Sequence, residues 1–322
     1  MIEIIQKRWF RLALLLFIFS IALLIRIQYI NKTIIIKPIV ADAQQYVIYG
    51  HKIINHGVYS KEYTDNPTPD SFRSPGYPMF IALAIFFGGD QGYYPIVIFT
   101  QVVFSSLLVL LTYYIGSFFL RFYYAVFTAT LVALSPHLVS ISSYILTETF
   151  FCFFLLASTG CFMIALQKKH SMLFFFAALL FGYTYLINET VLLLPFIFVF
   201  ISFLSFKLIF KRFKENNLGY KLILFLLLFT LFPAGWALRN NISLPPDAPT
   251  GSFRATSTLS HGAYPGFIYK NPQYKYFMYK EDPMQPEFGS SFKSFRRILW
   301  SRFKERPLRY ISWYIFEKPY YL

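Results

Sequence analysis

The feature that most constrains the fold of this chain is a succession of long apolar stretches that are almost free of charge. Four of them together contain only two acidic residues, Glu148 and Glu189, and no Lys or Arg. They are residues 91–120, 122–167, 171–206 and 222–238. A helix needs about 20 apolar residues to cross the hydrocarbon core of a bilayer. Only 14% of the residues are charged, against about 25% in soluble domains. The sequence therefore predicts an all-α polytopic membrane protein and excludes a soluble globular one.

The positions of the basic residues predict about seven transmembrane helices. The first apolar run, Trp9–Ile25, has Lys and Arg on both sides and no small-residue cleavage site after it, which indicates a retained anchor with a cytoplasmic N-terminus. The other six expected spans are Tyr94–Leu120, Phe122–Ser142, Thr149–Leu166, Met172–Ile187, Val191–Phe206 and Leu222–Leu238. Alternating crossings place the basic clusters between these spans on the cytoplasmic side. Lys and Arg are favoured on the cytoplasmic side of membrane spans, and this preference accounts for the net charge of +15. No nucleic-acid partner is therefore expected.

The remaining segments are expected outside the cytoplasm. Residues 1–238 form the expected transmembrane domain, with a first outer loop at residues 27–90 and an extracytoplasmic tail at residues 239–322. Gly76–Gly89 is too short to cross and predicts an interfacial helix on the outer face. The last residues, Leu308–Leu322, are rich in Trp and Tyr, as is typical of a membrane-interface segment.

An amphipathic helix is predicted over residues 42–56, because its apolar residues recur at spacings of three and four. His51 and Lys52 fall off the apolar face. Asp42 stands at the beginning of this helix, where it could be an N-cap that accepts backbone N–H bonds. It could equally be a general base or a cation ligand beside the membrane. The sequence leaves both interpretations open.

Further polar residues are expected at the same outer surface. Arg73 lies in a proline-rich loop, where either the phosphate of a lipid substrate or ordinary phospholipid headgroups could pair with it. Glu148 is expected near the outer end of a span, as a capping or interhelical polar residue or as a functional acid, and Glu189 at another helix end. His137 is expected to be a helix-end residue. The stretch from Ser257 to Gly266, which contains His261, suits a turn that lines a cleft.

Several short motifs, taken in their order along the chain, resemble those of a known enzyme family. They are Asp42-x-x-x-Tyr46, the loop Arg73-Ser74-Pro75-Gly76-Tyr77-Pro78, Leu146-Thr147-Glu148 after Ser135-Pro136, the segment 186–195 after Gly182, and Trp236-Ala237-Leu238-Arg239-Asn240. The chain resembles the GT-C superfamily of membrane glycosyltransferases, particularly the family 39 group of protein O-mannosyltransferases and lipid A aminoarabinose transferases. Two departures are Asn188, where a basic residue is common, and the end of the chain before the further spans of typical members. A fragment or an inactive remnant is therefore an alternative.

The resemblance implies a polyprenyl-phosphate-linked sugar donor and an acceptor lipid, glycan or protein at the outer face of a bacterial inner membrane. By motif position it places the catalytic acid at Asp42 and a second acid at Glu148. Our hypothesis adds that these two acids share a divalent cation. The residues expected to bind the donor phosphate are Arg73, Arg239, Lys52 and His51. Those expected to bind the acceptor are Tyr46, His261 and Glu189.

Two other functions remain alternatives at this point. A transporter or lipid flippase would carry ionisable groups near the bilayer midplane and two related halves, whereas here the acids are expected at one face and no repeat is visible. A membrane polymerase or acyltransferase acting on lipid-linked sugars would centre on a membrane-facing His or Arg, for which His137 is the candidate.

Overall fold

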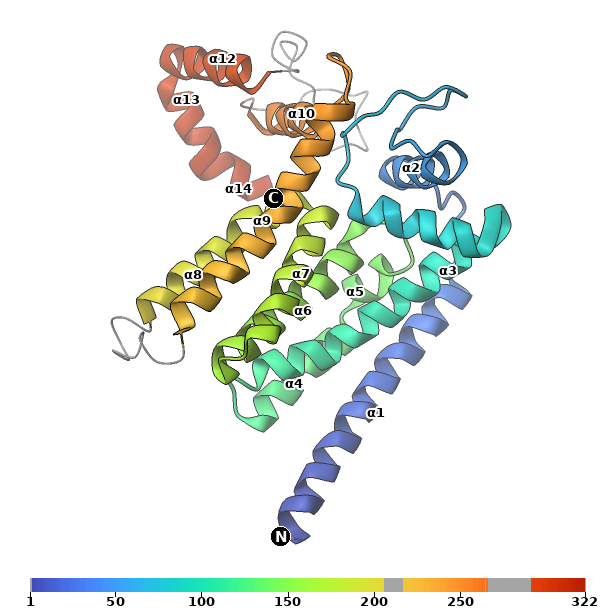
Figure 1. Ribbon diagram of the computed structural model, residues 1–322, viewed down its shortest axis with the longest axis vertical. Helices are drawn as coiled ribbons and strands as arrows, with labels where there is room; N and C mark the ends of the chain where they lie inside the picture. The colour runs from blue at the N-terminus through green and yellow to red at the C-terminus, as the bar shows by residue number, and fades with distance from the viewer. Residues whose placement is uncertain (1, 206–216, 264, 266–290, 322) are drawn as a thin grey trace. The chain divides into compact units, whose positions relative to one another are not determined.

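The computed structural model describes residues 2–205, 217–263, 265 and 291–321, and the described residues are almost entirely helical (Figure 1). The helices are α1 (Ile2–Lys32), α2 (Asp42–His56), α3 (Gly76–Gly116), α4 (Phe122–Leu134), α5 (Pro136–Ile141), α6 (Thr147–Lys168), α7 (Ser171–Ile187), η1 (Glu189–Leu193), α8 (Leu194–Leu204), α9 (Leu218–Ser243), α10 (Gly251–Ala263), α12 (Phe292–Glu305), α13 (Pro307–Ser312), η5 (Trp313–Glu317) and α14 (Lys318–Tyr321). No strand occurs within these ranges. The expected all-α class is confirmed.

The chain divides into two compact units. The first contains residues 1–69 and 74–244, and the second contains residues 70–73 and 245–322. The short segment Asp70–Arg73 joins the second unit through a bridge between Ser71 and Thr250, with the Ser71 N–H donating to the Pro249 carbonyl at 3.0 Å. The boundary therefore lies a few residues beyond the composition change at residue 239, because α9 continues to Ser243.

Among the described residues of the first unit, four helices are long and apolar enough to cross a membrane, which indicates a membrane-embedded protein. They are Trp9–Lys32, Gly76–Gly116, Thr147–Lys168 and Leu218–Ser243. Three apolar helical segments are shorter: Phe122–Leu134, Ser171–Ile187 and Glu189–Leu204. The number of seven crossings remains a prediction.

The helix α3 consists of two parts that meet at a break. Gly89 has φ 62° and ψ −171°, a conformation that glycine adopts readily and other residues do not. The first part covers the short segment that the sequence predicts to lie at the interface, and Figure 1 shows the second part running in a different direction toward α4. The first part packs against α2, and the second packs against α6, α4 and α1.

A buried arginine joins α1 to its neighbours. Arg26 is fully buried, and its Nε donates to Ser105 Oγ at 2.8 Å while its Nη atoms donate to the carbonyls of Ala133 (3.1 Å) and Val132 (3.3 Å). These carbonyls lie at the C-terminal end of α4, where Pro136 follows and has no N–H to offer. Arg26 thus supplies hydrogen bonds that the interrupted helix lacks.

Candidate functional site

Asp42 is the first residue of α2, which spans the range that the apolar spacing predicts. The cap position is occupied by Ala41, at φ 51° and ψ −118°, and no side-chain capping bond forms there. Asp42 itself lies in the first turn and is exposed. The N-cap interpretation therefore does not describe this carboxylate, and a strained residue immediately before it is the kind of feature that often accompanies functional sites.

Tyr46 lies one turn after Asp42 and points into the first unit. It is buried, and its ring meets the ring of Tyr77 on α3 edge to face at 5.1 Å between centroids. The Tyr77 hydroxyl donates to Gln101 Oε1 at 2.7 Å, and Gln101 Nε2 donates to the Tyr144 carbonyl at 2.7 Å. Both Tyr77 and Gln101 are fully buried. This chain of hydrogen bonds fixes the Tyr46–Tyr77 pair against the segment that precedes α6.

Glu148 lies in α6, the second helix that packs on Tyr77. It lies in the first turn of α6 and is exposed, with Thr147 Oγ1 at 3.4 Å from its Oε2. Leu146 holds the cap position without a side-chain bond, so Glu148 does not form a capping box. Phe150 packs its ring on Tyr77 at 5.4 Å, and the Glu148 carboxylate lies within electrostatic range of the Tyr77 hydroxyl. Asp42 and Glu148 therefore belong to helices that both pack on Tyr77.

The proline-rich loop ends against the C-terminal end of α7. Ser74 Oγ donates to Glu189 Oε2 at 2.5 Å, and Tyr183 Oη donates to the Gly76 carbonyl at 3.1 Å. A side chain at Gly76 would come within 2.8 Å of the Ile187 backbone nitrogen. The absence of a side chain at Gly76 is what permits this close approach, and Glu189 is held at the start of α3.

His51 and Lys52 make contacts within the segment between α1 and the second part of α3. His51 Nδ1 lies 3.5 Å from Asp90 Oδ1, across the gap between α2 and the break in α3. Lys52 Nζ donates to the Thr64 carbonyl at 2.6 Å. Further along the loop, Glu62 accepts bonds from the Thr68 N–H and hydroxyl at 2.8 and 2.7 Å, and these bonds lower the pKa of Glu62.

Arg239 connects the end of α9 to the loop after α2. Its guanidinium lies over the rings of Tyr59 (5.4 Å) and Trp236 (5.1 Å) and donates to the Tyr59 carbonyl at 3.4 Å. Tyr59 in turn stacks on Tyr49 of α2 at 4.2 Å. These contacts bring a cation to the same helix, α2, that carries Asp42.

The remaining predicted residues lie elsewhere. Arg73 belongs to the second unit, where it is buried beside the ring of Phe72 at 5.5 Å. The expected turn around His261 is wrong, because residues 251–263 form the helix α10, and the side chain of His261 lies outside the described residues. His137 is an exposed residue in the first turn of α5.

The first unit thus packs α2, which begins with Asp42, and α6, which carries Glu148 in its first turn, against Tyr77, a residue that the sequence did not single out as functional. Gln101 was also missed, although a lone amide inside a charge-free stretch is a signal that could have identified it. Within the described residues, no group of three or more His, Cys, Asp or Glu side chains is placed to hold a metal ion.

A cavity of about 490 Å³ lies near this region. Its walls come from the end of α1, the segment before α2 and the second part of α3, and include Ile30, Pro38, Tyr94 and Ser143. Ile30 and Tyr94 also pack against the apolar core that contains Tyr46 and Tyr77. The cavity is therefore mainly apolar and adjoins the apolar core that contains Tyr46 and Tyr77.

Comparison of the chain with protein-family models, curated proteins and solved structures gave no significant match.

Proposed function

We propose that this protein is a membrane glycosyltransferase that moves a sugar from a polyprenyl-phosphate-linked donor to a lipid, glycan or protein acceptor at the outer face of the membrane. The observation that supports the proposal best is that the helices carrying Asp42 and Glu148 both pack on the buried Tyr77, α2 through Tyr46 and α6 through Phe150. The two acids are far apart in sequence, and each is exposed in the first turn of its helix. Two exposed acids at the starts of helices that share a rigid aromatic contact, in a membrane-embedded unit, suit chemistry at the interface between lipid and water.

The proposed reaction is a direct displacement. Asp42 takes the proton from the acceptor hydroxyl while the hydroxyl oxygen attacks the anomeric carbon from the face opposite the phosphate. The bond from the anomeric carbon to the phosphate oxygen breaks, and the polyprenyl phosphate leaves with the bonding electrons. The configuration at the anomeric carbon is inverted. Glu148 orients the acceptor beside Asp42.

Other residues have supporting roles in the proposal. Arg239 stabilises the charge that grows on the leaving phosphate, and its contact with the loop after α2 favours this role. His51 and Lys52 are proposed to assist with the phosphate. The acceptor would contact Tyr46 and Glu189.

A divalent cation is compatible with this pair of acids. Mg²⁺ is commonly bound through one or two carboxylates together with phosphate oxygens and waters, so Asp42 and Glu148 would suffice as the ligands from the protein. Such a cation, when bound, neutralises phosphate charge.

The direct test is transfer of labelled sugar by the purified full chain. Labelled polyprenyl-phosphate sugars and crude envelope acceptors are incubated with the protein, with and without EDTA. General-base catalysis contributes typically 10²- to 10⁴-fold, so Asp42→Asn should reduce turnover by about that factor. Asp65→Asn, which removes an exposed acid from the same outer loop, is the matched control and should be unaffected. Near-normal transfer by Asp42→Asn refutes the base assignment, and no transfer by the unaltered chain with any donor refutes the proposal.

A second test addresses the membrane side of the two acids. Single cysteines at positions 42 and 148, introduced after Cys152→Ser and Cys161→Ser, should both react with a membrane-impermeant maleimide added from outside. Reaction of the two positions from opposite sides would exclude a shared site. Movement of a lipid or solute across vesicle membranes without sugar transfer would instead favour the transporter alternative.

A further inference from the structure

We propose that the cavity between α12 and the α13–η5 segment binds an anionic glycerophospholipid. The cavity has a volume of about 1010 Å³ and lies entirely within the second unit. It was not part of the predicted site. The inference stands independently of the proposed sugar transfer.

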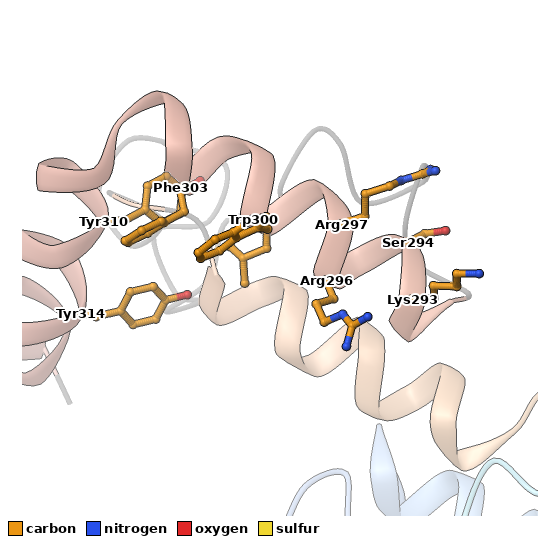
Figure 2. Close-up of a pocket in the computed structure, with 9 residues that line it drawn as sticks. Lys293, Ser294, Arg296, Arg297, Trp300, Phe303, Tyr310 and Tyr314 are labelled. Carbon is orange, nitrogen blue, oxygen red and sulfur yellow. The ribbon is translucent and has the colours of Figure 1, made fainter.

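One end of the cavity is cationic. Lys293, Arg296 and Arg297 line it from the first half of α12, and Figure 2 shows all three at the same end. Arg296 and Arg297 are exposed. Among the residues that the structure describes, no ion pair or hydrogen bond engages the side-chain charge of any of the three. Three cations within five residues of one helix favour binding of an anion at this end of the cavity.

The other end of the cavity is aromatic. Trp300 and Phe303 stack with centroids 5.5 Å apart and an interplanar angle of 9°, and Phe303 meets Tyr310 at 6.2 Å. Tyr314 completes this wall (Figure 2). Its hydroxyl lies 3.4 Å from the Ala263 carbonyl, which ties η5 to α10. Trp and Tyr are the residues that concentrate at the boundary between headgroups and acyl chains.

The two ends together define the chemistry of the occupant. The cations require a negative headgroup, and the aromatic wall requires an apolar chain beside it. Inorganic phosphate or a sugar phosphate would fill only the cationic end of a cavity this large. A zwitterionic lipid would bring no net charge to match three cations. Because the first unit is membrane-embedded, anionic phospholipids are available to the protein, and the basic amphipathic character of α12 is typical of helices that bind them.

The test compares two double variants that remove the same charge from α12 and its end. Arg296→Gln with Arg297→Gln changes the cavity, whereas Arg302→Gln with Arg306→Gln removes two cations that do not line it. The full chain is purified in a neutral detergent, delipidated, and titrated with dioleoyl phosphatidylglycerol or dioleoyl phosphatidylcholine. Bound lipid is counted by native mass spectrometry, and circular dichroism checks that each variant is folded.

We expect the unaltered protein to prefer phosphatidylglycerol. Each basic residue near an anionic lipid surface contributes about fivefold in affinity, so the cavity variant should bind phosphatidylglycerol roughly 30-fold more weakly. The control variant should stay within about threefold of the unaltered protein. Equal binding of the two lipids, or an equal loss in both variants, overturns the proposal. Polyprenyl phosphate is the rival anionic lipid: if it displaces phosphatidylglycerol at a lower concentration, the glycerophospholipid assignment is wrong.

Discussion

The hydrogen bonds beneath the acid pair allow a quantitative prediction. Gln101 accepts from the Tyr77 hydroxyl and donates to the Tyr144 carbonyl, and it is fully buried. Gln101→Leu keeps the approximate shape of the side chain but removes the partner of the Tyr77 hydroxyl and of the Ser142 carbonyl, which accepts from Gln101 Nε2 at 3.3 Å, whereas the Tyr144 carbonyl still accepts from the Leu146 N–H at 2.8 Å. A buried group that loses its partner costs about 1–2 kcal/mol. Two groups without partners should lower the free energy of unfolding by about 2–4 kcal/mol. The loss is about 1.2 kcal/mol if each hydrogen bond contributes only the average of about 0.6 kcal/mol found between membrane helices.

A double-mutant cycle separates this hydrogen bond from simple packing loss. Tyr77→Phe alone leaves the Gln101 oxygen without its donor, so we expect a loss of about 1 kcal/mol in the free energy of unfolding. In the double variant no orphaned hydroxyl remains. The combined loss should therefore be smaller than the sum of the two single losses, by about 2–3 kcal/mol, or by about 1.2 kcal/mol on the smaller membrane value.

The assay is equilibrium unfolding of the purified protein in detergent micelles, with circular dichroism as the signal. The control is Thr100→Val. Thr100 lies next to Gln101 at a partly exposed position, and its hydroxyl donates to a carbonyl of its own helix. This substitution should change the free energy of unfolding by less than about 0.5 kcal/mol. Additivity of the two single variants within about 0.3–0.5 kcal/mol would show that the bond does not couple Tyr77 to Gln101. That result would remove the rigid base on which our proposed site depends.

Three further predictions concern other contacts. Gly76→Ala places a methyl group against the Ile187 backbone nitrogen and should lower the free energy of unfolding by about 1–3 kcal/mol; an unchanged melting temperature would contradict this packing. Arg26→Met removes the side-chain donor of the Val132 and Ala133 carbonyls and should lower the free energy of unfolding by about 2–4 kcal/mol, although the Ser105 hydroxyl still donates to the Leu138 carbonyl. Arg26→Lys should be intermediate, and a more stable Met variant would show that burial of the charge costs more free energy than its hydrogen bonds contribute. Because the pKa of Glu62 is lowered in the folded loop, its contribution is present above the unfolded pKa and is lost as the pH falls through the lower folded value. The protection factor of the Thr68 amide against hydrogen exchange, corrected for the intrinsic rate at each pH, should therefore fall as the pH drops below the ordinary Glu pKa of about 4.5 and through the lower folded value, and Glu62→Gln should remove this change in protection.

The sequence predicts much of the local structure correctly because bilayer thickness and helical periodicity act over short stretches of chain. Asp42–His56 is a helix over the predicted range, and it buries Ala43, Tyr46 and Val47 as the spacing requires. The short segment after Gly76 ends at a break at Gly89. In contrast, residues 251–263 are polar and small but helical, because helix formation there does not depend on a long apolar run.

The residues around the acids could not be chosen from the sequence in the same way. Tyr77 and Gln101 look like ordinary members of an apolar helix until α2 and α6 are packed against α3, and Arg73 looks like a neighbour of Ser74 although it belongs to the other unit. What the sequence alone determined was membrane embedding, the helical class and the range of α2, since these depend on the solvent and on neighbouring residues. Which acid lies near which aromatic ring was decided only by tertiary packing, because contacts between residues distant in the chain depend on how the helices cross.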